Sequence, residues 1–155
     1  FEAPYLQFFL LIKKNRFFTF NDKMSNKTFG FINDTVSQID FLLLKYKLNK
    51  QNEMFYLGDR NSINIGKWSH QIAAAFNKNT PISIPYFIAK LLSYFGDFLG
   101  CFNIKIPLTS FRFKNMTEDQ IIDTSKINNL LQNKRYSHEK NISETINWIQ
   151  KERLK

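Results

Sequence analysis

Apolar residues recur every three or four positions along most of this chain, which is the spacing of one face of an α-helix. Residues suited to cap or open a helix, such as Asn, Asp, Ser, Thr and Pro, precede these stretches. The pattern predicts helices over residues 4–14, after Asn33 or Asp34, after Asn64, from Pro85, after Asp123 or Thr124, and after Ser137. The apolar positions that share a face in these helices are Leu6, Phe9, Leu10, Val36, Ile39, Leu42, Leu43, Trp68, Ile72, Ala73, Phe76, Ile127, Leu130, Leu131, Ile142, Ile146 and Ile149.

Short aromatic and β-branched runs lie between these helices and predict strands. The predicted strands cover residues 15–20, 28–32, 54–58 and 81–85, with a brief extended piece at 121–123 and a polar turn at 21–27. Alternating helices and strands favour an α/β or α+β fold, mainly helical with a few short strands. A chain of 155 residues is long enough for one domain, so residues 1–155 are predicted to form a single one.

One apolar stretch, residues 85–102, approaches the length of about 20 residues that a bilayer span needs. Lys90 and Asp97 interrupt it, and a charge near the bilayer centre is costly, so we expect a buried or partly buried helix and no membrane span. The lone cysteine, Cys101, has apolar neighbours and is expected to be an inert core thiol, which fits a reducing cytoplasm. The chain starts at Phe1 and not at Met, which indicates a fragment or processed product. Its opening apolar run has no basic segment before it and no small-residue cleavage site, so no signal peptide is expected.

The net charge of +9 raises the question of nucleic-acid binding. The basic residues are scattered, with no run of five like charges, and the abundance of Phe, Ile, Asn and Lys is typical of an AT-rich genome. We therefore expect no nucleic-acid partner. A non-catalytic basic module that binds nucleic acid or an anionic surface remains the alternative.

The residues needed for cofactor binding and catalysis are missing. The glycines at 30, 58, 66, 96 and 100 never form the closely spaced loop that a dinucleotide pyrophosphate requires. Three Tyr–Lys pairs have the four-residue spacing of a reductase acid/base pair (46 and 50, 86 and 90, 136 and 140), but none follows a glycine-rich loop. His70 and His138 lie far apart, and Glu118 and Asp119 are expected in a solvated turn. We predict no catalytic, cofactor or metal site.

Five segments, in order, resemble the distal part of extended short-chain dehydrogenases/reductases that act on nucleotide sugars. They are residues 5–44, 54–76, 84–100, 107–131 and 137–149. The segment IPYFIAKLLSYFGDFLG is similar to the family pattern iPlpllrllallgdllg, and PLTSFRFKNMTEDQIIDTSKINNLL is similar to pltssrlknlt followed by fdtsKi. Together they identify the chain with the NAD-dependent sugar-nucleotide epimerase/dehydratase family, closest to enzymes of surface-polysaccharide synthesis.

The resemblance implies an α/β fold that is the carboxy-terminal, substrate-binding portion of an extended Rossmann-type enzyme. The amino-terminal portion, with its NAD(P) and its catalytic Tyr and Lys, would be absent. This chain would bind a nucleoside-diphosphate sugar, act as an isomerase fragment beside the missing Rossmann portion in the cytoplasm, and associate into oligomers when made alone. A reductase-like protein that binds a nucleotide sugar without turnover is a further alternative.

The family pattern also places four substrate-binding residues. Lys27 and Arg112 fall where the family has basic residues near the diphosphate, with Lys114 competing for the second position. Phe18 and Phe20 fall on the strand around the nucleotide base, where core packing is the competing role. The chain departs from the pattern at 30 and 33, where Gly and Asn replace Val and Asp, and at 132, where Gln replaces Gly.

Overall fold

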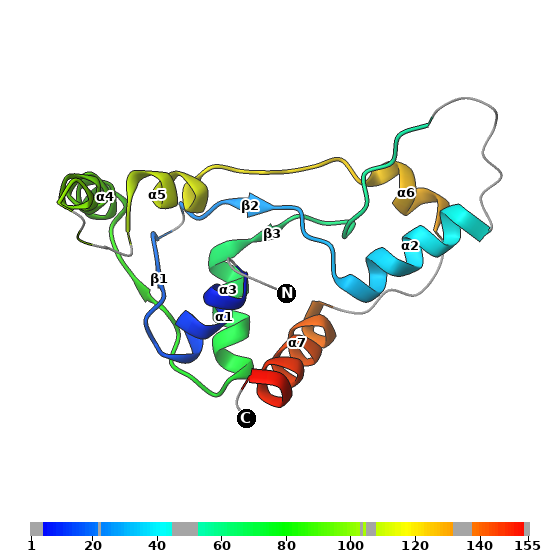
Figure 1. Ribbon diagram of the computed structural model, residues 1–155, viewed down its shortest axis with the longest axis horizontal. Coiled ribbons are helices and arrows are strands. Elements are labelled where there is room, and N and C mark those ends of the chain that lie inside the picture. The colour runs from blue at the N-terminus through cyan, green and yellow to red at the C-terminus, as the bar shows by residue number, and fades with distance from the viewer. Residues whose placement is uncertain are drawn as a thin grey trace. The chain divides into compact units, whose positions relative to one another are not determined.

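The computed structural model describes residues 5–21, 23–44, 53–102, 104, 108–131 and 138–153 (Figure 1). Within these ranges the chain is mostly helical, with a few two-residue strands, and is broadly α/β. In chain order the elements are α1 (Tyr5–Lys13), β1 (Phe18–Thr19), β2 (Asn26–Lys27), α2 (Ile32–Leu44), β3 (Ile63–Asn64), α3 (Ile65–Ala75), β4 (Ile82–Ser83), α4 (Tyr86–Gly100), α5 (Ser110–Thr117), α6 (Ser125–Leu130) and α7 (His138–Arg153).

The chain divides into two compact units, each built from two separate stretches. Unit 1 comprises Phe1–Asn26 and Asn64–Asp119, and unit 2 comprises Lys27–Ile63 and Gln120–Lys155. Strands β2 and β3 pair with each other, and the division falls within both strands. That residues 1–155 form a single substrate-binding domain stays a prediction.

Unit 1 is built on a helix pair and a parallel strand pair. Helix α1 contacts α3, and β1 pairs with β4 in parallel, with Phe18 opposite Ile82. Asn64 is the N-cap of α3, and its side-chain oxygen accepts hydrogen bonds from the Gly66 and Lys67 amides at 3.1 and 3.2 Å. The apolar core of this unit contains Leu6, Phe9, Ile12, Phe20, Met24, Ile65, Ile72, Ala73, Ala89, Leu108 and Phe113.

Unit 2 is held together by a buried amide that binds the backbone of a loop. The side-chain oxygen of Gln38, on α2, accepts a hydrogen bond from the Gly58 amide at 2.9 Å, and its nitrogen donates to the Gly58 carbonyl at 2.8 Å. The next amide, of Asp59, donates to the Phe29 carbonyl at 2.7 Å. These bonds fix residues 58 and 59 against α2 and the segment before it. The buried apolar residues of α6 and α7 are Ile127, Ile142, Ile146 and Ile149.

The helices expected from the apolar periodicity are present among the described residues. The caps behave as expected at Asn64, whereas Asn33 and Asp34 lie inside α2 and do not cap it. Thr124 is the N-cap of α6, but its side chain accepts no hydrogen bond from the first amides of the helix; the Asp123 side chain accepts the Ser125 amide instead at 2.8 Å. Pro4, Ser137 and Gln132 lie outside the described residues. The sequence predicts a loop where the structure has α5, at residues 110–117.

The strand predictions are correct at two places and wrong at two. Residues 15–20 and 81–85 contain β1 and β4, but 28–32 and 54–58 contain no strand, and the brief extended piece at 121–123 is not part of a strand either. The run at 54–58 looked buried because it is apolar, yet Met54 and Tyr56 are exposed. In the predicted polar turn, Met24 and Ser25 are buried and β2 follows. Whether an extended run becomes a strand depends on the segment that it pairs with, and the local residues do not encode that partner.

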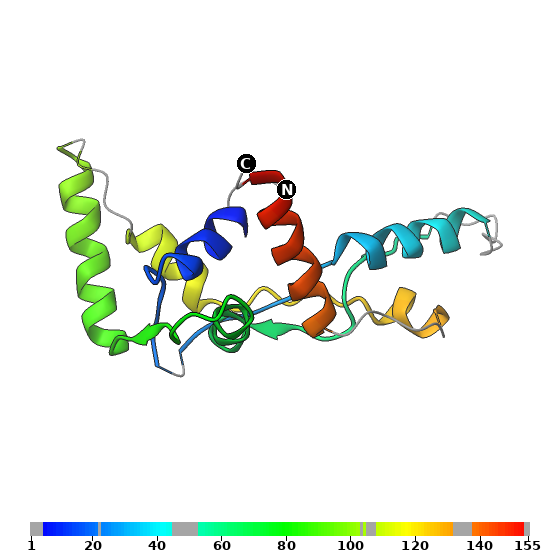
Figure 2. The ribbon, with the colours of Figure 1, turned by 90° about the horizontal axis from the view of Figure 1, so that it is seen from below.

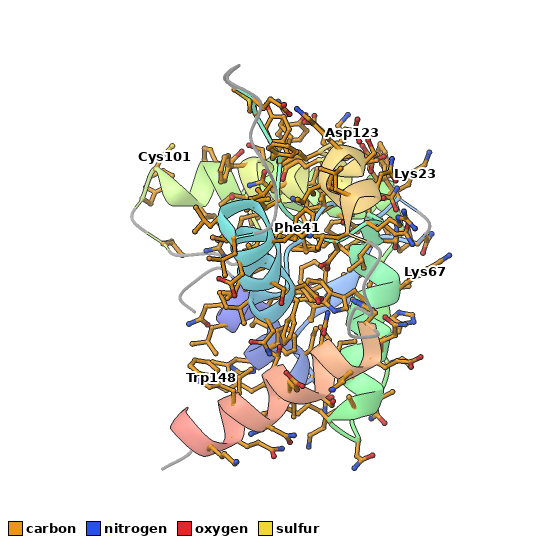
Figure 3. All side chains as sticks on the ribbon, turned by 90° about the vertical axis from the view of Figure 1, so that its right-hand side faces the viewer. Lys23, Phe41, Lys67, Cys101, Asp123 and Trp148 are labelled. Atoms are coloured by element: carbon orange, nitrogen blue, oxygen red, sulfur yellow. The ribbon has the colours of Figure 1, made fainter. Side chains whose placement is uncertain are left out.

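Two burial predictions are corrected. Cys101 is exposed at the end of α4, so it is not a core thiol (Figure 3). On α2 the helix was predicted correctly but its buried face was not, because Asp34 and Gln38 are buried while Val36, Ile39 and Leu43 are exposed. As for the long apolar stretch, none of the helices in the described ranges has the length and apolar character to cross a bilayer.

Candidate functional site

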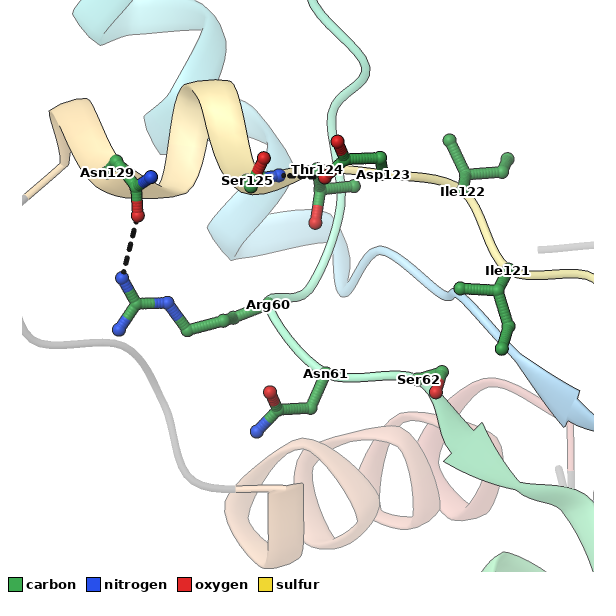
Figure 4. Close-up of a pocket in the computed structure, with 9 residues that line it drawn as sticks. All are labelled: Arg60, Asn61, Ser62, Ile121, Ile122, Asp123, Thr124, Ser125 and Asn129. Carbon is green, nitrogen blue, oxygen red and sulfur yellow. Dashed lines mark hydrogen bonds between the residues drawn. The ribbon is translucent and has the colours of Figure 1, made fainter.

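An open pocket with a volume of about 460 Å³ lies in unit 2 (Figure 4). Two stretches of backbone form its walls: residues 60–62 before β3, and residues 121–125 leading into α6, with Asn129 from α6 itself. A pocket of this volume is within the range that binds small molecules. Its lining includes a guanidinium, two side-chain amides, three hydroxyls and one carboxylate, contributed by Arg60, Asn61, Asn129, Ser62, Thr124, Ser125 and Asp123.

A hydrogen bond from Thr124 joins the two walls, and Asn128 supports the Thr124 hydroxyl. Its hydroxyl donates to the Asp59 carbonyl at 2.8 Å, and the Asn128 side-chain amide donates to the same hydroxyl oxygen at 2.7 Å. Both Thr124 and Asn128 are buried. Because Asp59 precedes Arg60, this chain of bonds fixes where the Arg60 backbone enters the pocket.

The pocket carries one positive and one negative side chain. Arg60 donates from one guanidinium nitrogen to the Asn129 side-chain oxygen at 3.2 Å, and the guanidinium is otherwise exposed (Figure 4). Hydrogen bonds from Ser125 hold the pKa of the Asp123 carboxyl below its usual value, so this carboxylate is ionised at neutral pH. The pocket therefore offers a planar cation beside neutral and anionic acceptors.

Lys27, a predicted substrate-binding residue, lies in unit 2 beside the segment that leads into the pocket. It forms a parallel bridge with Gln120, and its ammonium donates to the Gln120 side-chain oxygen at 3.0 Å. Partial burial lowers the Lys27 pKa. Lys27 does not line the pocket, but it is bonded to the residue immediately before Ile121 in the pocket wall.

Arg112, the second predicted diphosphate contact, lies in unit 1 on the first turn of α5. This corrects its expected place in a loop: its amide donates to Thr109, the N-cap of the helix, at 3.4 Å. Its side chain is exposed. The competing residue, Lys114, is also exposed, and its ammonium nitrogen lies 3.8 Å from a carboxylate oxygen of Glu118, one helical turn later.

Phe18 and Phe20 both belong to unit 1, on and immediately after β1. Their ring centroids lie 5.7 Å apart, which agrees with the expectation that they point to the same side. Phe20 is fully buried and its ring lies 5.2 Å from that of Phe113, so it packs in the core. Phe18 is half-buried and is the one of the two with exposed surface for a ligand.

The described residues contain no obvious catalytic group. Of the three Tyr–Lys pairs, only 86 and 90 are described in full, and there Tyr86 packs 5.1 Å from the Phe113 ring while Lys90 is exposed. Tyr46, Lys50 and Tyr136 lie outside the described residues. Among the residues described, no three His, Cys, Asp or Glu side chains gather where they could hold a metal ion.

Sequence reasoning missed Arg60 and Asn129, which line the pocket. The available signal was the polar run DRNS directly after Gly58, since such a run after a glycine favours an exposed turn. No protein-family model, no curated protein and no solved structure matches this chain. The resemblance to the epimerase/dehydratase family thus stays a prediction from the sequence.

Proposed function

We propose that this chain is the nucleoside-diphosphate-sugar-binding portion of an NAD-dependent epimerase/dehydratase of surface-polysaccharide synthesis. The proposal begins from the five segments that follow the family's order over nearly the whole sequence. It does not depend on any single motif, because each segment alone is weak.

The pocket of unit 2 is the observation that carries the proposal. Arg60 offers a planar guanidinium that can engage two phosphate oxygens at once, and its position is supported by Asn129. The surrounding side-chain amides and hydroxyls can donate to and accept from sugar hydroxyls, while the ionised Asp123 accepts only. A phosphorylated sugar derivative matches this combination better than an apolar ligand does.

Under this proposal Lys27 contributes positive charge near the pocket segment without lining it. Its lowered pKa follows from partial burial, and a nearby phosphate would favour its charged form. Arg112 and Phe18 are proposed substrate contacts that belong to unit 1. Phe20 supports the site only through core packing, because no part of its side chain is exposed.

We propose that hydride transfer occurs elsewhere in the parent enzyme, on a Rossmann portion that binds NAD(P). This chain has no glycine loop for the pyrophosphate in its 155 residues. Its partners would be the nucleotide sugar, the Rossmann portion and further copies of itself. It would bind no NAD alone and catalyse no reaction alone.

Isothermal titration with UDP, a UDP-sugar and uridine tests the proposal. We expect the two diphosphates to bind and uridine to bind at least about tenfold more weakly, because the phosphates supply the charge-assisted hydrogen bonds. Arg60→Gln should weaken UDP binding by about tenfold or more. The matched control is Arg16→Gln, which removes an exposed arginine of unit 1 that does not line the pocket.

Two results would count against the proposal. Equal affinities of UDP and uridine would exclude phosphate recognition, and equal losses in Arg60→Gln and Arg16→Gln would exclude this pocket. Binding of duplex DNA that falls steeply with salt, without binding of UDP, would favour the basic-module alternative suggested by the net charge of +9.

A further inference from the structure

Helix α4 buries small residues and exposes large apolar ones, which is the reverse of an ordinary surface helix. The residues it buries are small: Ala89, Ser93 and Gly96, spaced four and three apart on one face. This helix contacts α5 (Figure 2). The opposite face is large, apolar and exposed. We call this face the apolar arc; its residues, each between 46% and 75% exposed, are Phe87, Leu91, Leu92, Tyr94, Phe95 and Phe98.

The charged residues of α4 lie outside the apolar arc. At about 100° per residue, Lys90 and Asp97 fall between the buried stripe and one edge of the arc, which itself spans roughly 160° without a charge. Asp97 accepts a hydrogen bond from the Ser110 amide at 3.1 Å, so its carboxylate is engaged at the start of α5. Water therefore faces an uninterrupted apolar surface across half of the helix, which is costly unless something covers it.

Exposed basic residues lie on this helix and on α5, although Lys114 of α5 is also within 3.8 Å of a Glu118 carboxylate oxygen. Unit 1 contains ten Lys or Arg and five Asp or Glu in its sequence. Lys90 is exposed on α4, and Arg112 and Lys114 are exposed on α5, which α4 contacts. An apolar surface flanked by basic side chains is the arrangement by which a helix lies in the interface of an anionic bilayer.

We propose that α4 is an interfacial anchor that inserts its apolar arc into an anionic lipid surface. The helix has 15 residues and a length of about 22 Å, shorter than a hydrocarbon core of about 30 Å, so it lies along the surface. A second copy of the chain is the less favoured occupant. A two-fold contact through α4 would bring the same basic residues of both copies toward one another, whereas anionic headgroups neutralise them.

Vesicle flotation of the full chain tests this proposal, since bound protein rises with the vesicles and aggregated protein does not. Vesicles of phosphatidylcholine with 30 mol% phosphatidylglycerol are compared with pure phosphatidylcholine. We expect at least about fivefold stronger partitioning into the anionic vesicles at low salt, and most of that difference should disappear in 0.5 M NaCl, where the Debye length is only a few ångströms.

The decisive comparison uses two matched pairs of adjacent leucines. Leu91→Gln with Leu92→Gln removes part of the apolar arc and should lower partitioning about tenfold or more. Leu43→Gln with Leu44→Gln makes the same chemical change at two exposed leucines of α2, a helix without Lys or Arg, and should leave partitioning nearly unchanged. Circular dichroism checks that both variants keep their helices.

A further variant keeps the apolar arc intact and changes only charge. Lys90→Glu, at an exposed position, should weaken binding to anionic vesicles about tenfold and leave binding to neutral vesicles unaffected. The proposal is overturned if wild-type protein does not float with anionic vesicles, or if the α2 pair loses as much partitioning as the α4 pair. It is also overturned if Lys90→Glu floats with anionic vesicles as wild type does. The proposal is overturned as well if the wild-type protein does not float but forms dimers, and the double substitution Leu91→Gln with Leu92→Gln abolishes these dimers. That result would identify a second copy of the chain as the occupant of the apolar arc.

Discussion

Replacing Gln38 with methionine should lower the free energy of unfolding of unit 2. The loss should exceed that of an ordinary substitution between buried side chains of equal length. Gln38 is 1% exposed, and its amide makes both of the hydrogen bonds to Gly58, at 2.8 and 2.9 Å. Methionine has a similar length, so little cavity forms, but the Gly58 amide and carbonyl lose their partners inside the protein. An unsatisfied buried polar group costs about 1–3 kcal/mol, so we expect a loss of about 2–4 kcal/mol in the free energy of unfolding.

Urea unfolding followed by circular dichroism measures this loss, and amide hydrogen exchange at Gly58 locates it. With a denaturant slope of about 2 kcal/mol per molar, which is typical of a small protein in urea, the midpoint should fall by roughly 1–2 M. The control is Gln71→Met, the same substitution at an exposed position of α3. If Gln38→Met unfolds within about 0.5 kcal/mol of that control, the two hydrogen bonds do not stabilise the unit, and the reasoning is refuted.

Four further substitutions test the local structure and its dependence on pH. Asn64→Ala removes the N-cap of α3 and should cost about 1–2 kcal/mol in thermal unfolding, whereas Asn79→Ala, at an exposed loop position, should cost almost nothing; equal losses would contradict the cap. Gly58→Ala should cost at least about 1–3 kcal/mol, because its φ of 155° is strained for alanine and the new carbon would lie 2.9 Å from a carbonyl oxygen. Gly100→Ala meets nothing within 4 Å at the end of α4 and should be neutral or stabilising; similar effects at both glycines in urea unfolding would be contrary to the structure. Burial lowers the pKa of His138, with Asp59 and Glu139 opposing more weakly, so the neutral form is favoured in the folded state. The stability that neutral His138 contributes is complete above the ordinary histidine pKa of about 6.5 and is lost as the pH falls through its lower pKa in the folded state. Between pH 8 and pH 5, wild type should therefore lose more stability than His138→Gln. Parallel pH profiles of stability would exclude this role.

Local signals in the sequence predicted local structure well. Asn64 followed by apolar residues at helical spacing identified α3 with its cap, and Ile142, Ile146 and Ile149 identified the buried face of α7. Such features need only a few neighbouring residues to form. They are therefore readable without knowing what the helix packs against.

Features that depend on distant residues were not predictable in the same way. The run at 54–58 is apolar enough for a buried strand, but it finds no strand partner, and Met54 is exposed. On α2 the apolar stripe is exposed because Gln38 is the residue that binds Gly58, twenty positions away. The pocket likewise depends on Thr124 holding Asp59, and no spacing rule links two residues so far apart in the chain.

Because each unit is assembled from two separated stretches, the chain passes from one unit to the other three times, at 26–27, 63–64 and 119–120. During synthesis, unit 1 cannot be completed until residue 119 has left the ribosome, and unit 2 must wait for α7 near the carboxy terminus. No single truncation yields either unit intact. Isolating unit 1 would require a linker that joins residue 26 to residue 64, and a series of simple end deletions would damage both units together.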